Sequence, residues 1–126
     1  MKNMNSVNLV GRLTRDMDTR TTASGFTIGK IGLAVNTTKK DGDKFLDYAN
    51  FFDVTILGKT ADSLKPFLVK GKQIGVQGRL EQERWEKDGS KFSKVVVIAE
   101  HIELLGGKSE ERKSEPSNEY EDDIPF

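Results

Sequence analysis

Residues 51–68 read FFDVTILGKTADSLKPFL, a strand pattern that runs directly into a short helix pattern. In 52–56 the apolar side chains recur at every second position, the spacing of a strand that buries one face. In 60–68 apolar residues follow Thr60, a candidate N-cap, and Pro66 should limit the helix to roughly two turns. One strand followed at once by one short helix is the feature around which the rest of the chain can be ordered.

Four other segments have strand-like patterns, two before this stretch and two after it. The apolar positions of one segment change phase, which predicts a bulge near Gly29 and Lys30. Gly78 falls among the core-facing positions of its segment, which predicts a close approach by another part of the chain. Asp-Gly pairs, typical of hairpin turns, separate two pairs of strands. The segments are 6–13, 26–35, 74–80 and 95–98, and the pairs are Asp41-Gly42 and Asp88-Gly89.

This order of elements predicts an all-β fold, a five-stranded OB-fold with one short helix between the third and fourth strands. The OB-fold is a small Greek-key barrel whose open face and hairpin loops bind oligomers. A five-stranded SH3-like barrel is the alternative. It fits less well, because a helix after its third strand would have no natural place.

The formal net charge of zero is the sum of two unlike segments. Residues 1–107 carry 17 basic and 13 acidic side chains, whereas 108–126 carry 3 basic and 7 acidic ones. We therefore expect a folded domain over 1–107 and a disordered acidic tail over 108–126, which has too few apolar residues to bury. The plain explanation of such a tail is a solubilising appendage. Its last residues, Asp122-Asp123-Ile124-Pro125-Phe126, suit instead a small apolar pocket with a basic rim.

Two aromatic residues fall on the polar phase of the predicted strands. In 51–57 the even positions face the core, so Phe51 points outward, and the same reasoning applies to Trp85 beyond 74–80. A single exposed aromatic residue more often has no binding role, or belongs to a subunit contact, than binds a ligand. Two of them interleaved with Lys and Arg match what a single nucleic-acid strand requires, because bases have flat apolar faces and a charged backbone.

The sequence gives little support to an enzyme. It contains no Cys, which excludes disulfides, thiolate metal sites and cysteine nucleophiles. Its one histidine, His101, lies beside apolar residues near the end of the last strand, where a structural role is expected. Because no metal-ligand cluster or nucleophile motif occurs, we expect no catalytic residue, metal or cofactor. No signal-peptide or membrane-span pattern occurs either, which predicts an intracellular protein with no membrane partner.

Taken in order, these motifs resemble the bacterial and phage single-stranded DNA-binding protein family, SSB, over nearly the whole chain. Each motif alone is a weak signal, whereas their order together with the acidic terminus is highly specific. The matching segments are VNLVGRL (7–13), FFDVTILGK (51–59), KGKQIGVQGRL (70–80), RW (84–85), IELLG (102–106) and DDIPF (122–126).

The resemblance implies an OB-fold that wraps single-stranded DNA without sequence preference. It places Phe51 and Trp85 at base-stacking positions, and Leu57 at a third position that is usually aromatic. The first stacking position of the family falls in 37–40, which contains no aromatic residue. We therefore expect thinner stacking here, with more reliance on lysines.

The resemblance also implies partners and a location. It implies a homotetramer, in which 1–107 binds DNA and forms the subunit contacts. It assigns Asp122, Asp123, Ile124, Pro125 and Phe126 to the docking of replication, recombination and repair proteins. The implied location is the cytoplasm, at the nucleoid, or a host cytoplasm if a phage encodes the protein.

The leading hypothesis is a non-enzymatic binder of single-stranded DNA that protects single strands and recruits other proteins through its acidic tip. Bases would stack on the aromatic residues, and cationic side chains would neutralise phosphates. The predicted phosphate-binding residues are Arg12, Lys39, Lys40, Lys59, Lys72, Arg79, Arg84 and Lys91. The alternative is a primosome-type OB-fold protein whose main role is to bridge other proteins, with DNA binding incidental.

Overall fold

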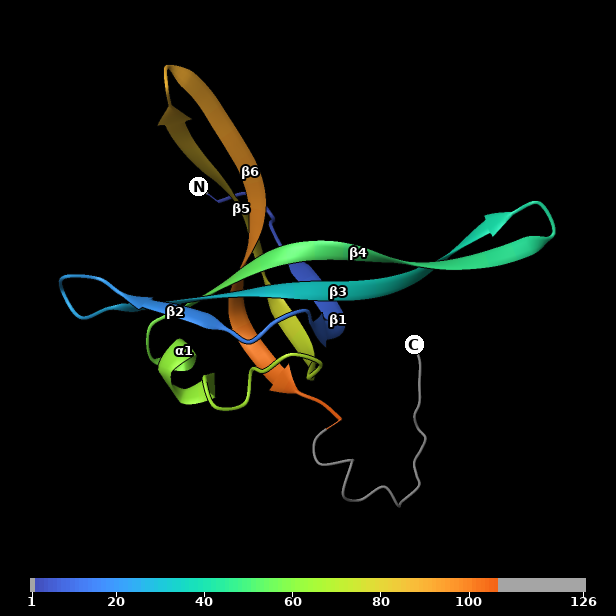
Figure 1. The fold of residues 1–126 in the computed structure, drawn as a ribbon, viewed down its shortest axis with the longest axis horizontal. Helices are drawn as coiled ribbons and strands as arrows, with labels where there is room; N and C mark the ends of the chain where they lie inside the picture. The colour runs from blue at the N-terminus through green and yellow to red at the C-terminus, as the bar shows by residue number, and fades with distance from the viewer. Residues whose placement is uncertain (1, 107–126) are drawn as a thin grey trace.

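The computed structural model describes residues 2–106. Within them it contains long, curved strands and one short helix (Figure 1). The elements are β1 (Val7–Leu13), β2 (Asp18–Thr21), β3 (Thr27–Asp41), β4 (Lys44–Leu57), α1 (Lys59–Leu64), β5 (Gln73–Lys87) and β6 (Ser90–Leu104). The predicted acidic tail and its tip lie outside the described residues.

Five of the strands close into a barrel. The hydrogen-bonded order is β1-β5-β6-β4-β3, and a further pairing of β1 with β3 completes the circle. The pairing of β4 with β6 is parallel, and the others are antiparallel. This is the predicted OB-fold, with its helix between the third and fourth barrel strands. The short β2 is an addition that pairs with β3 as a hairpin; its sequence, DTRT, is wholly exposed and has no apolar period.

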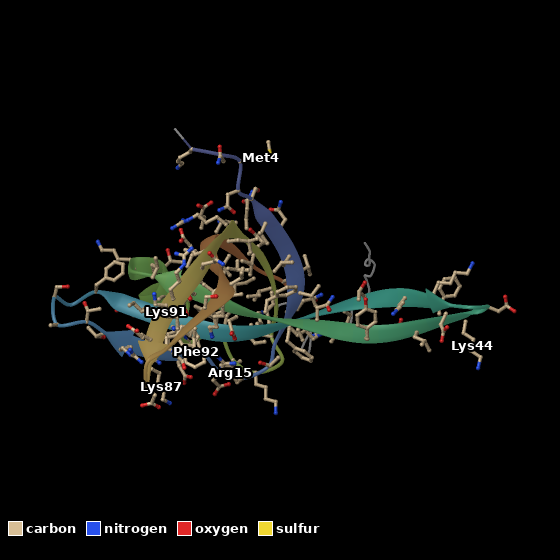
Figure 2. All side chains as sticks on the ribbon, turned by 90° about the horizontal axis from the view of Figure 1, so that it is seen from above. Met4, Arg15, Lys44, Lys87, Lys91 and Phe92 are labelled. Carbon is tan, nitrogen blue, oxygen red and sulfur yellow. The ribbon has the colours of Figure 1, made fainter. Side chains whose placement is uncertain are left out.

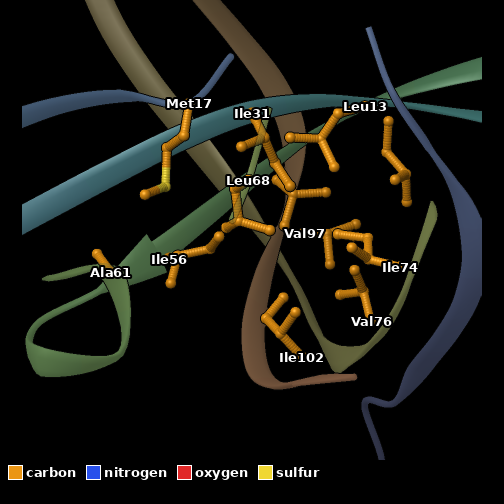
Figure 3. Close-up of a cluster of buried hydrophobic side chains, with 12 residues drawn as sticks. Leu13, Met17, Ile31, Ile56, Ala61, Leu68, Ile74, Val76, Val97 and Ile102 are labelled. Atoms are coloured by element: carbon orange, nitrogen blue, oxygen red, sulfur yellow. The ribbon is translucent and has the colours of Figure 1, made fainter. Parts of the chain in front are cut away.

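The core fills the interior of this barrel (Figure 3). The alternation of β4 is visible in it, because Val54 and Ile56 are fully buried whereas Phe51 is 70% exposed. The buried set is Leu13, Met17, Ile31, Leu33, Val54, Ile56, Ala61, Leu68, Ile74, Val76, Val97 and Ile102.

The bulge predicted near Gly29 and Lys30 is wrong. Strands β3 and β4 pair without a register shift from Ile28 to Asp41. Gly29 takes a core-facing position, where a Cβ would lie 2.5 Å from the sulfur of Met17. The apolar phase changes in the sequence because Met17 fills the space of the missing side chain, while Ile28 faces outward.

A register shift occurs instead in the β5–β6 pair, between Gln77 and Gly78. Gly78 is buried there, and a Cβ on it would collide with the carbonyl oxygen of Ile98. The close approach predicted from the sequence is thus confirmed as a backbone-to-backbone contact inside the barrel wall.

Helix α1 lies at one end of the barrel, and its start differs from the prediction. It begins at Lys59, and the N-cap is Gly58 with φ 69° and no side-chain cap, so Thr60 is not the N-cap. Gly58 can adopt this left-handed conformation because it has no Cβ, and its N–H donates to the carbonyl of Thr27 at 2.7 Å. The hydroxyl of Thr27 donates to Asp62 at 2.7 Å, which ties the helix to β3.

Two hairpins extend beyond the barrel (Figure 1). The β5–β6 turn has Asp88 and Gly89 at its centre, both with positive φ, as a type I′ turn requires. The β3–β4 turn has Gly42-Asp43 at its centre, one residue later than the predicted Asp-Gly pair. Most side chains of both hairpins are exposed on each face.

Replacing Gly78 by alanine should destabilise the barrel by about 1–3 kcal/mol, because the new methyl group meets backbone that cannot move aside. Gly75→Ala is the matched control on the same strand, since its Cβ would have a nearest neighbour at 3.6 Å. We expect the control to change stability by less than about 0.5 kcal/mol. Urea denaturation of both variants at one protein concentration measures the difference, and equal losses would contradict this account.

Candidate nucleic-acid interface

One side of the β2–β3–β4 sheet points away from the core, and we call it the outer face. The odd positions of β4, from Phe51 to Leu57, form one edge of it, as the alternation predicted. Phe51 is 70% and Leu57 37% exposed. Six residues of strand separate them, which is about 20 Å. The members are Asp18 and Arg20 of β2, Ile28, Lys30, Gly32 and Ala34 of β3, and Phe51, Asp53, Thr55 and Leu57 of β4.

Arg12 extends this face at the Phe51 end. Ala34 is the Cα partner of Arg12 on one side and of Phe51 on the other. Two strand spacings therefore separate the cation from the aromatic ring, about 10 Å between backbones. The guanidinium donates to the carbonyl of Gly71 at 3.1 Å, which fixes its direction. Arg12 and Phe51 therefore share a face, but the guanidinium is directed to Gly71, on the β5 side of β1 and away from β4.

A groove of about 600 Å³ lies at the Leu57 end of the outer face. Thr55 is only 6% exposed although its phase is outward, and it is one of the residues that line this groove. Lining side chains include Arg15, Arg20, Lys30, Thr55, Leu57 and Glu83.

The three cations of this groove were missed by the sequence reasoning. Arg20 belongs to β2, which has no apolar pattern, and Lys30 belongs to the supposed bulge. Arg15 lies in the loop before β2, and its guanidinium lies over Gly32, where a Cβ would be 2.6 Å from Nη1. The absence of a side chain at Gly32 is the signal that could have placed Arg15 on the sheet.

The β5–β6 hairpin carries the second aromatic site. Trp85 and Phe92 are Cα partners whose rings stack at 5.7 Å with an angle of 21°, and each is 44% exposed. Figure 2 shows Phe92 with Lys87 and Lys91 towards the end of this hairpin, which crosses the β3–β4 strands in that view. Phe92 therefore packs against Trp85 across the hairpin.

Two ion pairs join this hairpin to the outer face. Glu83 Oε2 lies 3.8 Å from Nζ of Lys30, and Lys94 Nζ donates to Oδ2 of Asp53 at 3.0 Å. Glu83 and Lys94 are Cα partners of each other. The hairpin face that carries Trp85 is thus the one turned towards the sheet.

The register separates the predicted hairpin cations from that face. Arg84 and Lys91 pair with Ser93 and Glu86, so they alternate with Trp85 and belong to the opposite face. The guanidinium of Arg84 donates to Gln82. The structure places Lys94 on the Trp85 face in their stead.

Arg79 is held by two carboxylates. It donates to Glu100 at 3.1 Å and to Glu81 at 3.4 Å, and these hydrogen bonds raise the pKa of its guanidinium above the ordinary value. Its phosphate contact stays a prediction, with two anions already beside it. The remaining predicted cations lie off the outer face: Lys59 begins α1, Lys72 precedes β5, and Lys39 and Lys40 lie on the β3–β4 hairpin.

The β3–β4 hairpin presents an aromatic residue that the sequence did not assign to binding. Phe45 is 69% exposed and is the Cα partner of Lys40. By the alternation of β4 it belongs to the same side of the strand pair as Phe51. Leu46 and Tyr48 belong to the other side. An aromatic ring therefore does stand beside the 37–40 stretch, supplied by the opposite strand.

Features of other functional classes are few in the described part of the chain. His101 is exposed, and its Nε2 lies 2.9 Å from Glu103 Oε1. Residues 2–106 contain no group of three or more His, Asp or Glu side chains placed to hold a metal ion. Over the same residues, no helix has the length and apolar character to cross a membrane.

Comparison with known proteins gives similarities of sequence and of fold. Residues 4–105 match the model of the single-strand binding protein family. A single-stranded DNA-binding protein of Treponema pallidum is 41% identical over 106 residues, which are 84% of this chain and 60% of that protein. One from Aquifex aeolicus is 37% identical over an alignment of 149 positions, which covers 98% of this chain and 99% of that protein. The solved complex of the Plasmodium falciparum SSB with ssDNA shares the fold, with a TM-score of 0.76 at 20% identity over 83% of this chain and 97% of that one.

Proposed function

This chain belongs to the single-strand binding protein family, and from that premise we propose that it binds single-stranded DNA without sequence preference and has no catalytic activity. One observation carries the proposal within the molecule itself. The exposed ring of Phe51 and cationic side chains share the outer face, which the barrel does not need for its core, and the β5–β6 hairpin turns the Trp85–Phe92 pair towards it. Such a combination suits a ligand with flat apolar bases and a charged backbone.

Stacking would occur at two separate places. Phe51 presents a bare ring on the outer face, and the Trp85–Phe92 pair presents a second platform on the hairpin above it. Every base has a flat π-face, so stacking of this kind does not select a sequence. Leu57 offers apolar contact without a ring, and Phe45 offers a ring at the far hairpin.

Phosphate contacts would come from cations beside these platforms. Arg12 lies on the same face as Phe51, two strands away across Ala34, and Arg15, Arg20 and Lys30 lie around the groove near Leu57. Each phosphate that they neutralise releases counterions, which makes binding sensitive to salt. Lys39, Lys40, Lys59, Lys72, Arg79, Arg84 and Lys91 remain predicted contacts for DNA that continues beyond the face.

We further propose a division of labour between 1–107 and 108–126. The first would bind DNA, and the second would carry the tip Asp122–Phe126, on which replication, recombination and repair proteins dock. The similarity to the Aquifex relative covers 98% of this chain, so it extends beyond 1–107 into the second segment. Such a protein acts where single strands arise, in the cytoplasm. The competing proposal is a protein whose main role is to bridge other proteins. Deleting the tip distinguishes the two proposals.

A homotetramer is proposed as the working assembly. Several apolar side chains outside the outer face are exposed, such as Val10 at 45% and Val95 at 55%. Sedimentation equilibrium at micromolar concentration should give four times the chain mass of 14.1 kDa. A monomer under those conditions would exclude wrapping of DNA around several subunits.

Truncating the stacking residues should weaken binding of oligo-dT. Loss of one base–aromatic contact costs roughly 1–3 kcal/mol, so Phe51→Ala and Trp85→Ala should each weaken binding roughly 5- to 150-fold. Phe67→Ala is the control, since Phe67 is 52% exposed but lies after α1, off the outer face. Anisotropy of a labelled oligonucleotide measures all three. A wild-type protein that binds duplex DNA as tightly as oligo-dT would sink the proposal.

Deleting Asp122–Phe126 should abolish pull-down of replication enzymes and leave oligo-dT binding equal or tighter, because the deletion removes acidic charge. Replacing the same five residues by a Gly-Ser segment controls for chain length. The measurement compares capture from extract with DNA affinity for the same preparations. Loss of DNA binding on deletion would contradict the division of labour.

A further inference from the structure

Four charged side chains connect the β5–β6 hairpin to the outer face, and we call them the clasp. They are Lys30, Asp53, Glu83 and Lys94. Lys30 and Asp53 come from β3 and β4, and Glu83 and Lys94 come from β5 and β6. The two ion pairs run in opposite senses, so each strand pair gives one cation and one anion.

The backbone register places these four residues in one compact group. Glu83 and Lys94 are direct Cα partners in the hairpin. On the sheet, Lys30 is the partner of Thr55, which is two positions from Asp53 on β4. Positive and negative charges therefore alternate around the group, and each has an opposite charge from the other layer.

The clasp lies on the path that DNA would follow. Asp53 stands between Phe51 and Leu57 on the same edge of β4. Lys30 and Glu83 line the groove at the Leu57 end. A strand that contacts both ends of the outer face must pass the two carboxylates, which repel phosphates.

Each charged side chain of the clasp can exchange its partner for another ion with only a small change in free energy. Their side chains are between 35% and 51% exposed, so water and salt screen them. Exposed pairs of this kind contribute little to stability. The clasp is therefore not required to hold the barrel together, whose core lies beneath the sheet.

Given the proposed function on which this rests, we infer that the clasp is an exchangeable lock on the DNA path. Glu83 and Asp53 occupy the places of phosphates on Lys30 and Lys94 in the free protein. DNA opens the clasp by substituting its phosphates for both carboxylates. The released carboxylates regain counterions from solution, which offsets part of the counterion release that favours binding. Glu83 and Asp53 thus lower both the affinity and its salt dependence.

Glu83→Gln tests this directly, because it keeps the size of the side chain and removes its charge. We expect oligo-dT to bind about two- to fivefold more tightly at low salt, the range that one exposed ion pair can supply. The plot of log affinity against log salt should steepen by about 0.7, the value of one further phosphate on a single strand. Anisotropy of a labelled oligonucleotide avoids any effect on Trp85 itself.

Glu86→Gln is the matched control, with the same chemical change on the same hairpin. Glu86 pairs with Lys91, on the face opposite to Glu83. A gain in Glu83→Gln no larger than in this control would overturn the clasp. So would weaker binding, which would mean that the ion pairs hold the hairpin in its binding position.

A double variant asks whether Glu83 acts through Lys30. In a Lys30→Gln background the gain from Glu83→Gln should shrink, since the cation it frees is absent and only the relief of phosphate repulsion remains. A gain of undiminished size there would also overturn the proposal. Asp53→Asn should repeat the effect at the second pair. If the wild-type protein fails to bind oligo-dT at all, the proposed function fails first, which keeps the two failures distinct.

Discussion

Strand β4 can turn only one of its faces to the barrel core, and the arrangement of the other elements follows from this constraint. Val54 and Ile56 commit that face to the barrel interior, where β3 and β6 flank the strand. The opposite face then holds Phe51, Asp53 and Leu57 in solvent or under a loosely attached hairpin. A register slip of one residue would exchange the two sets, so the same interactions that close the core also decide which side chains lie on the outer face.

The repetitive features of this molecule were predictable from sequence, whereas its contacts between distant strands were not. The two-residue period of β4 and β5, the Asp88-Gly89 turn and the helix after Leu57 all follow local rules. Gly29 violated such a rule because Met17 fills its place in the core. The β2 strand carries no apolar residue and owes its existence to pairing with β3. The Lys30–Glu83 and Asp53–Lys94 pairs join positions far apart in the chain, and no periodicity reports them.

The charges of the candidate site are more balanced than those of a simple cationic groove. Arg12, Arg15 and Arg20 lie on or beside the outer face, but Asp18, Asp53 and Glu83 lie among them. A face with cations alone would bind any polyanion. If Phe51 and Trp85 stack on bases as proposed, the interspersed carboxylates leave these rings as the feature that separates a flexible single strand from other polyanions, because paired bases could not reach them.

The two hairpins beyond the barrel are ribbons one layer thick, with no interior of their own. Phe45 and Lys40 are cross-strand partners, as are Trp85 and Phe92, whose rings stack, and none of the four belongs to the barrel core. Changes at such exposed positions usually alter folding stability very little. Substitutions in the ribbons can therefore change ligand preference, in evolution or by design, while the barrel sequence stays constant. The fold and its specificity can change independently of each other.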